Sequence, residues 1–145
     1  MNEIGFVHKL QDLIKADHQG VLILKPNDQK TMGIPDLLVF WAGRAYAIEA
    51  KVARGVPRDK EALWLDHDFS GPQVNTLRQL GANDIAAIGL IYIANTGECA
   101  AIPARHIRME MSFSYVGRAG TPFSLERGSV RILDRIDNIH RGVQP

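Results

Sequence analysis

The sequence predicts an α/β fold in which helices flank one mixed β-sheet, and three observations lead to this prediction. Apolar residues recur at helical spacing in two segments, 3–20 and 70–82. Short apolar runs of strand length lie between and after these segments. Turn residues divide the chain into the order α-β-β-β-α-β-β-α, which is typical of a helix-covered sheet. The 145 residues fit a single domain, 1–145, with a sizeable core.

The first predicted helix, 3–20, has one apolar face and ends at a glycine. Glu3 falls on that same face. It also lies in the first turn, where a carboxylate favours the helix dipole, so the dipole alone could explain it. The apolar face consists of Phe6, Val7, Leu10, Leu13 and Ile14.

The second predicted helix, 70–82, has Ser70 as its N-cap, a proline in its first turn and Gly81 at its end. Gln73 completes a Ser-x-x-Gln capping box, in which its side chain bonds back to the Ser70 backbone. Gln73 also shares a face with Leu77 and Leu80, so it could instead point toward the sheet. These two uses compete for one side chain.

Five strands are predicted around these helices, and the most apolar of them, 85–94, is expected to be central. The strands are 21–24, 36–40, 45–51, 85–94 and 98–102. A polar loop with two lysines precedes the second strand, and residues 52–68 are predicted to form a loop with a helical turn near 61–65. Beyond residue 102 we expect a helix over 103–111, then short strands or extended segments near 113–116 and 129–133.

Composition and charge exclude several classes of protein. No apolar run approaches the roughly 20 residues that cross a bilayer, so no membrane partner is expected. The single cysteine, Cys99, excludes an internal disulfide framework and a cysteine zinc cluster, and favours a cytoplasmic compartment. The histidines lack zinc-site spacing. Net charge is +1, and although all basic residues after residue 100 are arginines, which suit phosphate, charge alone favours an ordinary solvated surface.

The stretch "GIPDLLVFWAGRAYAIEAK", residues 33–51, places ionisable groups inside an apolar hairpin. A two-residue turn at Ala42–Gly43 would set Asp36 opposite Glu49, with Lys51 on the same face. Two facing carboxylates are destabilising, so a shared proton or a divalent cation is expected to compensate. In the alternative interpretation, Asp36 only begins a strand, while Glu49 and Lys51 form a surface ion pair or a solvated strand end.

This stretch resembles the signature of the PD-(D/E)XK nuclease superfamily. Pro35-Asp36 matches the PD, and Glu49-Ala50-Lys51 matches the E-x-K. It is most similar to the virus-type replication-repair nuclease group (VRR-NUC), which is common among small phage proteins, and its layout is similar to that of Holliday junction resolvases. The resemblance implies a bacterial, possibly phage-encoded setting and a restriction-endonuclease-like αβββαβ core.

The resemblance covers about residues 3–103 of the chain. The segment 52–69 is longer than in compact members of the group, and the extension 104–145 has no counterpart. Both segments could carry substrate choice or pack a dimer interface.

The resemblance implies a DNA endonuclease that uses Mg²⁺ or Mn²⁺ to hydrolyse phosphodiester bonds. Its substrates would be junction, flap or branched DNA in replication, repair or recombination. Asp36 and Glu49 would ligate the metal together with the carbonyl of Ala50, and Glu3 would add a ligand directly or through water. Lys51 would position the attacking hydroxide or neutralise a phosphate oxygen.

The resemblance also implies roles for Gln73 in catalysis and for Lys9 and Lys25 in DNA binding. Lys30, in the same polar loop as Lys25, is a further candidate for a phosphate contact, and solvated charge is the alternative for these lysines. Two other functions stay open: a non-cleaving DNA-binding or accessory domain on the same fold, and a domain in which the acids form only a salt-bridge cluster. A symmetric homodimer would place two sites on the two strands of a junction.

Overall fold

The structure is a computed structural model, and it describes residues 1–26, 33–65 and 67–143 of the chain. The strands are β1 (Leu22–Leu24), β2 (Leu37–Trp41), β3 (Arg44–Ala53), β4 (Ala86–Ile93), β5 (Cys99–Pro103) and β6 (Thr121–Phe123). The helices are α1 (Glu3–Asp17), α2 (Gly71–Ala82), α3 (Phe113–Ala119) and α4 (Ile132–Arg141), with a short 3₁₀ turn, η1 (Ala104–His106).

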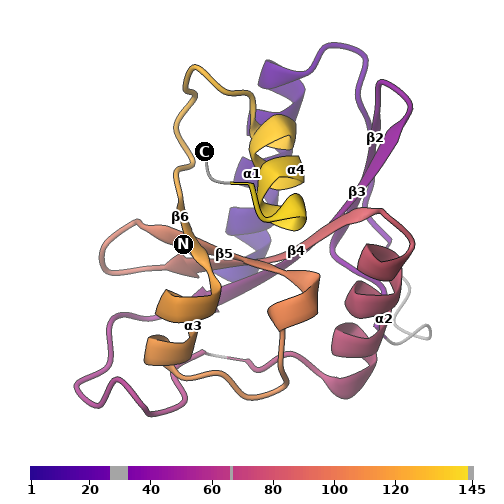
Figure 1. Ribbon diagram of the computed structural model, residues 1–145. Coiled ribbons are helices and arrows are strands. Elements are labelled where there is room, and N and C mark those ends of the chain that lie inside the picture. The colour runs from indigo at the N-terminus through magenta and orange to yellow at the C-terminus, as the bar shows by residue number, and fades with distance from the viewer. Residues whose placement is uncertain (27–32, 66, 144–145) are drawn as a thin grey trace.

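The described strands form one mixed sheet in the order β1-β2-β3-β4-β5-β6. Strands β3 and β4 pair in parallel, and the other neighbours pair antiparallel. Helices α1 and α4 pack on one face of the sheet and α2 and α3 on the other, each with its own apolar core (Figure 1). The predicted α/β fold with a mixed, helix-flanked sheet is therefore confirmed. None of the described helices is both long and apolar enough to cross a bilayer.

The register predicted for the β2–β3 hairpin is confirmed. Ala42 and Gly43 form its turn, with φ angles of 52° and 76°, as a two-residue hairpin turn requires. Leu37 pairs with Ile48 and Trp41 with Arg44, so the next pair outward would be Asp36 and Glu49. The prediction for the central strand also holds, because β4 is almost wholly buried between β3 and β5.

The expectations for the chain beyond residue 102 were wrong. The helix predicted at 103–111 is only the turn η1, because the chain leaves the helical path at Ile107, whose carbonyl accepts a hydrogen bond from Arg78 of α2. The extended segments predicted near 113–116 and 129–133 lie instead in α3 and around the start of α4. Helix α4 buries one apolar face against the sheet.

The helical turn predicted near 61–65 is displaced, because the backbone turn that the structure shows runs from Asp59 to Ala62 and the described residues after it are extended. Ala53 and Leu65 form an isolated antiparallel bridge, and so do Leu63 and Ser112. This extended path lets Trp64 enter the core, where its ring meets Phe113 edge-to-face at 5.0 Å. The extended backbone and the burial of this large aromatic ring therefore occur together here.

The start of α4 is capped by the end of α1. Helix α4 has no capping side chain of its own at Arg131. Instead Asp17 Oδ2 accepts from the Ile132 N–H at 3.1 Å, and His18 Nε2 accepts from the Leu133 N–H at 3.1 Å. Arg127 adds an ion pair to Asp17 at 2.8 Å. These bonds fix the C-terminal extension to the core.

The indole of Trp41 joins the same contact. His18 meets its ring edge-to-face at 4.4 Å, and the Arg131 guanidinium stacks on it at 4.5 Å. Trp41 therefore covers the core in this structure. Arg127 and Arg131 make these contacts while more than half of each side chain stays exposed, in line with the expectation of a solvated arginine surface.

We expect Ile136→Ala to lower the free energy of unfolding by about 2–5 kcal/mol, because Ile136 is fully buried where α4 covers the sheet. Chemical denaturation measures this change. Val130→Ala is the matched control, since the Val130 side chain is 42% exposed and its truncation should cost little. Equal losses in the two variants would show that α4 does not close the core.

Candidate metal centre

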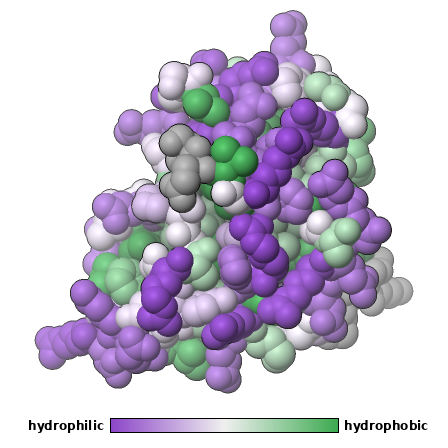
Figure 2. Space-filling view, viewed as in Figure 1, coloured by the Kyte–Doolittle hydropathy of each residue, from purple (hydrophilic) through white to green (hydrophobic). Residues whose placement is uncertain are grey.

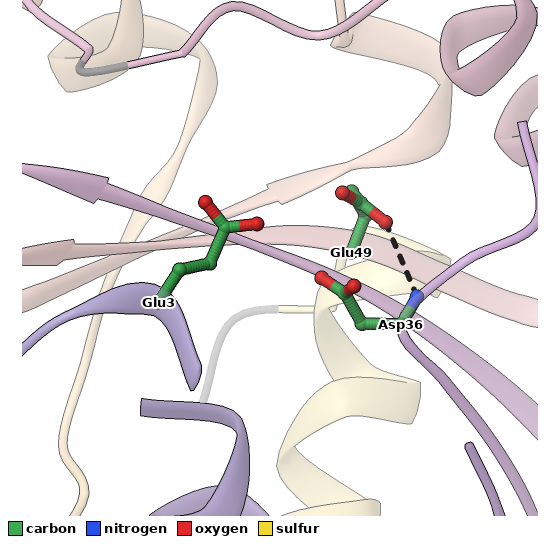
Figure 3. Close-up of side chains that lie close together, drawn as sticks. All are labelled: Glu3, Asp36 and Glu49. Carbon is green, nitrogen blue, oxygen red and sulfur yellow. Dashed lines mark hydrogen bonds between the residues drawn. The ribbon is translucent and has the colours of Figure 1, made fainter. Parts of the chain in front are cut away.

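Three carboxylates from separate parts of the chain meet at one point. Glu3 comes from the first turn of α1, Asp36 directly precedes β2, and Glu49 lies in β3 (Figure 3). One oxygen from each lies within 4.8 Å of the others. The structure thus brings together the three acids that the sequence predicted as metal ligands.

Asp36 and Glu49 hold each other through backbone groups. The Asp36 N–H donates to Glu49 Oε1 at 3.2 Å (Figure 3). The Ala50 N–H donates to Asp36 Oδ2 at 2.9 Å. The second bond is possible because the pairing of β2 with β3 begins only at Leu37 and Ile48. The Ala50 N–H therefore has no strand partner in β2 and donates to the Asp36 side chain instead. Since the N–H and C=O of one strand residue point to the same edge, the Ala50 carbonyl also faces this edge.

Burial raises the pKa of both Glu49 and Asp36. The pKa of Glu49 rises from 4.5 to about 8, first because the side chain is buried and then because Asp36 and Glu3 carry like charge. Burial also raises the pKa of Asp36, against the opposing effects of the Ala50 N–H, Lys51 and Lys25. A positive charge near these acids would therefore stabilise their ionised forms.

Lys51 supplies one such positive charge. Its Nζ lies 3.5 Å from Glu49 Oε2, and the residue is only 5% exposed, so it is not a solvated strand end. Its Nζ also lies 5.3 Å from the centre of the Phe69 ring. That ring fills space beside β4 that only a glycine leaves open, since a Cβ at Gly89 would lie 2.7 Å from Phe69 Cζ. Sequence reasoning missed both Phe69 and Gly89.

Gln73 uses the two ends of its amide for two purposes. Its Oε1 accepts from the Ser70 N–H at 2.9 Å and completes the capping box of α2. Its Nε2 donates to Glu49 Oε2 at 2.9 Å. The expectation that the two uses compete was therefore wrong. The cap orients the amide so that its donor faces the acids.

Gly33 brings the Asp36 segment against α2. Its φ is +89°, a conformation that favours glycine, and a Cβ there would lie 2.5 Å from the Pro72 carbonyl oxygen. Backbone therefore touches backbone one residue before Gln73. This contact fixes the distance between the segment that carries Asp36 and the helix that carries Gln73.

The predicted DNA-contacting lysines lie in different places. Lys25 is exposed and lines a hollow of about 520 Å³ together with Glu3 and Asp36. Lys9 lines a different cavity, beside residues of β5 and β6. Lys30 lies outside the described residues.

A second hollow of about 440 Å³ also includes Glu3, and it is lined by Arg54 and His67. Sequence reasoning missed these two residues. Arg54 directly follows β3. The position of His67 depends on the path of the long segment between β3 and α2, and no local sequence pattern predicts that path.

The donor set fits a hard divalent cation. Carboxylate and carbonyl oxygens are the ligands that Mg²⁺ and Mn²⁺ prefer. A cation would favour the ionised form of Glu49, which burial and then the charge of Asp36 disfavour. Exposed acid clusters are common without any ion. This cluster differs from them because Glu49 is only 1% exposed and bonds to three other residues, namely Asp36, Lys51 and Gln73.

The buried Glu49 carboxyl predicts a pH dependence of stability in metal-free protein. Its folded pKa of about 8 exceeds the ordinary value of 4.5, so the folded protein retains a proton that the unfolded chain releases between these values. The free energy of unfolding should therefore fall as pH rises from about 5 to 8, and saturating Mg²⁺ should oppose the fall. Denaturation series at each pH measure it. An equally steep fall in Glu49→Gln would contradict the assignment.

The close contact at Gly33 predicts a large effect of Gly33→Ala. Strain at positive φ costs roughly 1–2 kcal/mol, and the clash with Pro72 should add to it. Gly20→Ala separates the two contributions, because Gly20 has a φ of +80° and no atom within 4 Å of an added Cβ. Gly33→Ala should be the more destabilising variant and should also weaken Mn²⁺ binding in calorimetry. Similar losses at both positions would count against the contact.

Comparison with known proteins gives no family for this chain. No protein-family model matches the sequence, and no curated protein is similar enough to match it. The function must therefore be inferred from the chemistry of Glu3, Asp36, Glu49, Lys51 and Gln73 themselves.

Proposed function

We propose that this protein is a Mg²⁺- or Mn²⁺-dependent nuclease of the PD-(D/E)XK type, which hydrolyses phosphodiester bonds in DNA. One observation carries the proposal. Buried Glu49 is bonded to Asp36, Lys51 and Gln73 at once, and Glu3 lies within reach of the same point. A lone acid or ion pair would not need this arrangement.

Asp36, Glu49 and Glu3 are the residues that would hold the metal, together with the carbonyl of Ala50. A bound divalent cation would supply Lewis-acid stabilisation of the charge that develops on the phosphoryl oxygens. For this, the Glu49 carboxyl must release the proton that it retains up to a pH of about 8. Lys51 favours this release, because its cation lies against the same carboxylate.

Lys51 and Gln73 serve the reaction as fixed donors. The Lys51 ammonium has three N–H bonds, so contact with Glu49 leaves donors for a water nucleophile or a phosphate oxygen. The Gln73 amide is held by the cap of α2 and keeps the Glu49 carboxylate in one orientation. Fixed donors of this kind stabilise developing charge without reorganisation during the reaction.

The hollow beside the acids supports DNA as the substrate. Lys25 lies at its rim, where a flanking phosphate could pair with the ammonium group. A net charge of +1 implies moderate, salt-sensitive binding through local contacts. We propose branched DNA, such as junctions and flaps, as the preferred substrate, and a homodimer for junctions. A non-cleaving DNA-binding domain is the alternative function.

The proposal predicts metal-dependent cleavage of DNA. The protein is incubated with linear, flapped, forked and four-way DNA in Mg²⁺, Mn²⁺ or EDTA. Cleavage should require the metal, and Asp36→Asn and Lys51→Ala should each lower its rate by about 100-fold or more, because they remove a ligand and a fixed cation. Asp12→Asn and Lys15→Ala are matched controls on the exposed face of α1 and should retain activity.

Three kinds of result would overturn the proposal. Cleavage that persists in EDTA, or that survives both site substitutions, excludes the metal mechanism. DNA binding without cleavage in either metal favours the accessory function. Absence of both DNA binding and Mn²⁺ binding would leave a buried salt-bridge cluster as the explanation.

A further inference from the structure

We infer that a hollow in the C-terminal extension binds a phosphate group. The hollow has a volume of about 280 Å³ and lies between η1, the end of α3, β6 and the end of α4. Figure 2 shows the molecule from this face, and strongly hydrophilic side chains gather there over η1 and the end of α4. The hollow shares no lining residue with the two hollows beside the acids, so this inference goes beyond the proposed nuclease site.

The lining of this hollow is basic. Arg105, His106, Arg118 and Arg135 contribute to it, and no aspartate or glutamate lines it among the described residues. Within the same part of the chain, none of the three arginines forms an ion pair with a carboxylate. An anion bound in this hollow would have three guanidinium groups in its lining, and each can attract and hydrogen-bond it.

Arg105 is already held in position. Its Nη1 donates to the carbonyl of His140 near the end of α4. Its Nη2 lies against Gly142, whose φ is +74° and where a Cβ would come within 3.1 Å of that nitrogen. A guanidinium has five N–H donors, so this anchoring leaves further donors for a ligand. Little side-chain entropy is then lost on binding.

Arg135 forms a second fixed part of the wall. Its Nη1 donates to the Ser124 carbonyl at 2.8 Å, and its guanidinium stacks on the Phe123 ring at 4.7 Å. Burial lowers the pKa of Arg135, which shows that water compensates its charge poorly. Arg118, in the last turn of α3, is exposed and completes the basic lining.

The chemistry of the lining selects a phosphate group as the ligand. A guanidinium group can donate two parallel hydrogen bonds to two phosphate oxygens. The polar residues Thr121, Ser124 and Asn138 line the same hollow. The volume is slightly below the roughly 300–1,000 Å³ of pockets for drug-sized ligands, which suits a phosphate with one attached sugar. Such a group occurs in a nucleic-acid backbone and in free phosphorylated metabolites.

The test measures binding in EDTA, so that it does not depend on cleavage. Inorganic phosphate and a short DNA oligonucleotide are titrated separately at constant ionic strength, and amide shifts or calorimetry give the dissociation constants. Arg118→Ala should weaken phosphate binding by about tenfold, since it removes a charged donor and no hydrogen bond described within the protein. Arg58→Ala removes an exposed arginine elsewhere and should leave phosphate affinity unchanged.

Equal phosphate affinities in the wild-type protein, Arg118→Ala and Arg58→Ala would overturn the inference, and so would a failure of the wild-type protein to bind phosphate. If Arg118→Ala also weakens binding of the oligonucleotide, the phosphate comes from nucleic acid. If it weakens only inorganic phosphate, a small phosphorylated molecule is the ligand. Neither result depends on whether Asp36 and Glu49 support cleavage.

Discussion

The candidate site depends on two hydrogen bonds that join the Asp36 and Glu49 segments. Each carboxylate accepts a hydrogen bond from the backbone beside the other acid, so two groups of like charge stay together. This becomes possible where β2 stops pairing with β3 and leaves backbone donors unused. The same position buries Glu49 and raises its pKa. The register of the β2–β3 hairpin thus determines which strand residues pair, the burial of Glu49 and its raised pKa.

Helix α2 adds a hydrogen-bond donor in a fixed position, the Gln73 amide, to this pair of acids. Gln73 caps the helix with one end of its amide and reaches Glu49 with the other. Gly33 lets the chain that carries Asp36 lie directly on the Pro72 backbone. The start of α2 therefore sets both the position of the acids and the orientation of their donor. Polar networks of this kind define a unique geometry only when every member is bonded.

The hairpin could be predicted from the sequence because a two-residue turn determines every pair along both strands. The position of Gln73 could also be predicted, because a capping box is a local signature. Helix α4 could not, since its first N–H groups are capped by Asp17 and His18 and no capping side chain lies next to it. Arg54 likewise reaches the Glu3 hollow through tertiary packing alone.

The bond between His18 and Leu133 joins residues that are 115 positions apart in the chain. During synthesis α1 leaves the ribosome long before α4, and until then the α1 face of the sheet lacks the helix that completes its core. Closing so long a loop has a larger entropic cost than pairing strands that follow one another in the chain, as the neighbours of this sheet do. This apolar face of the nascent protein therefore stays half-covered until α4 packs on it.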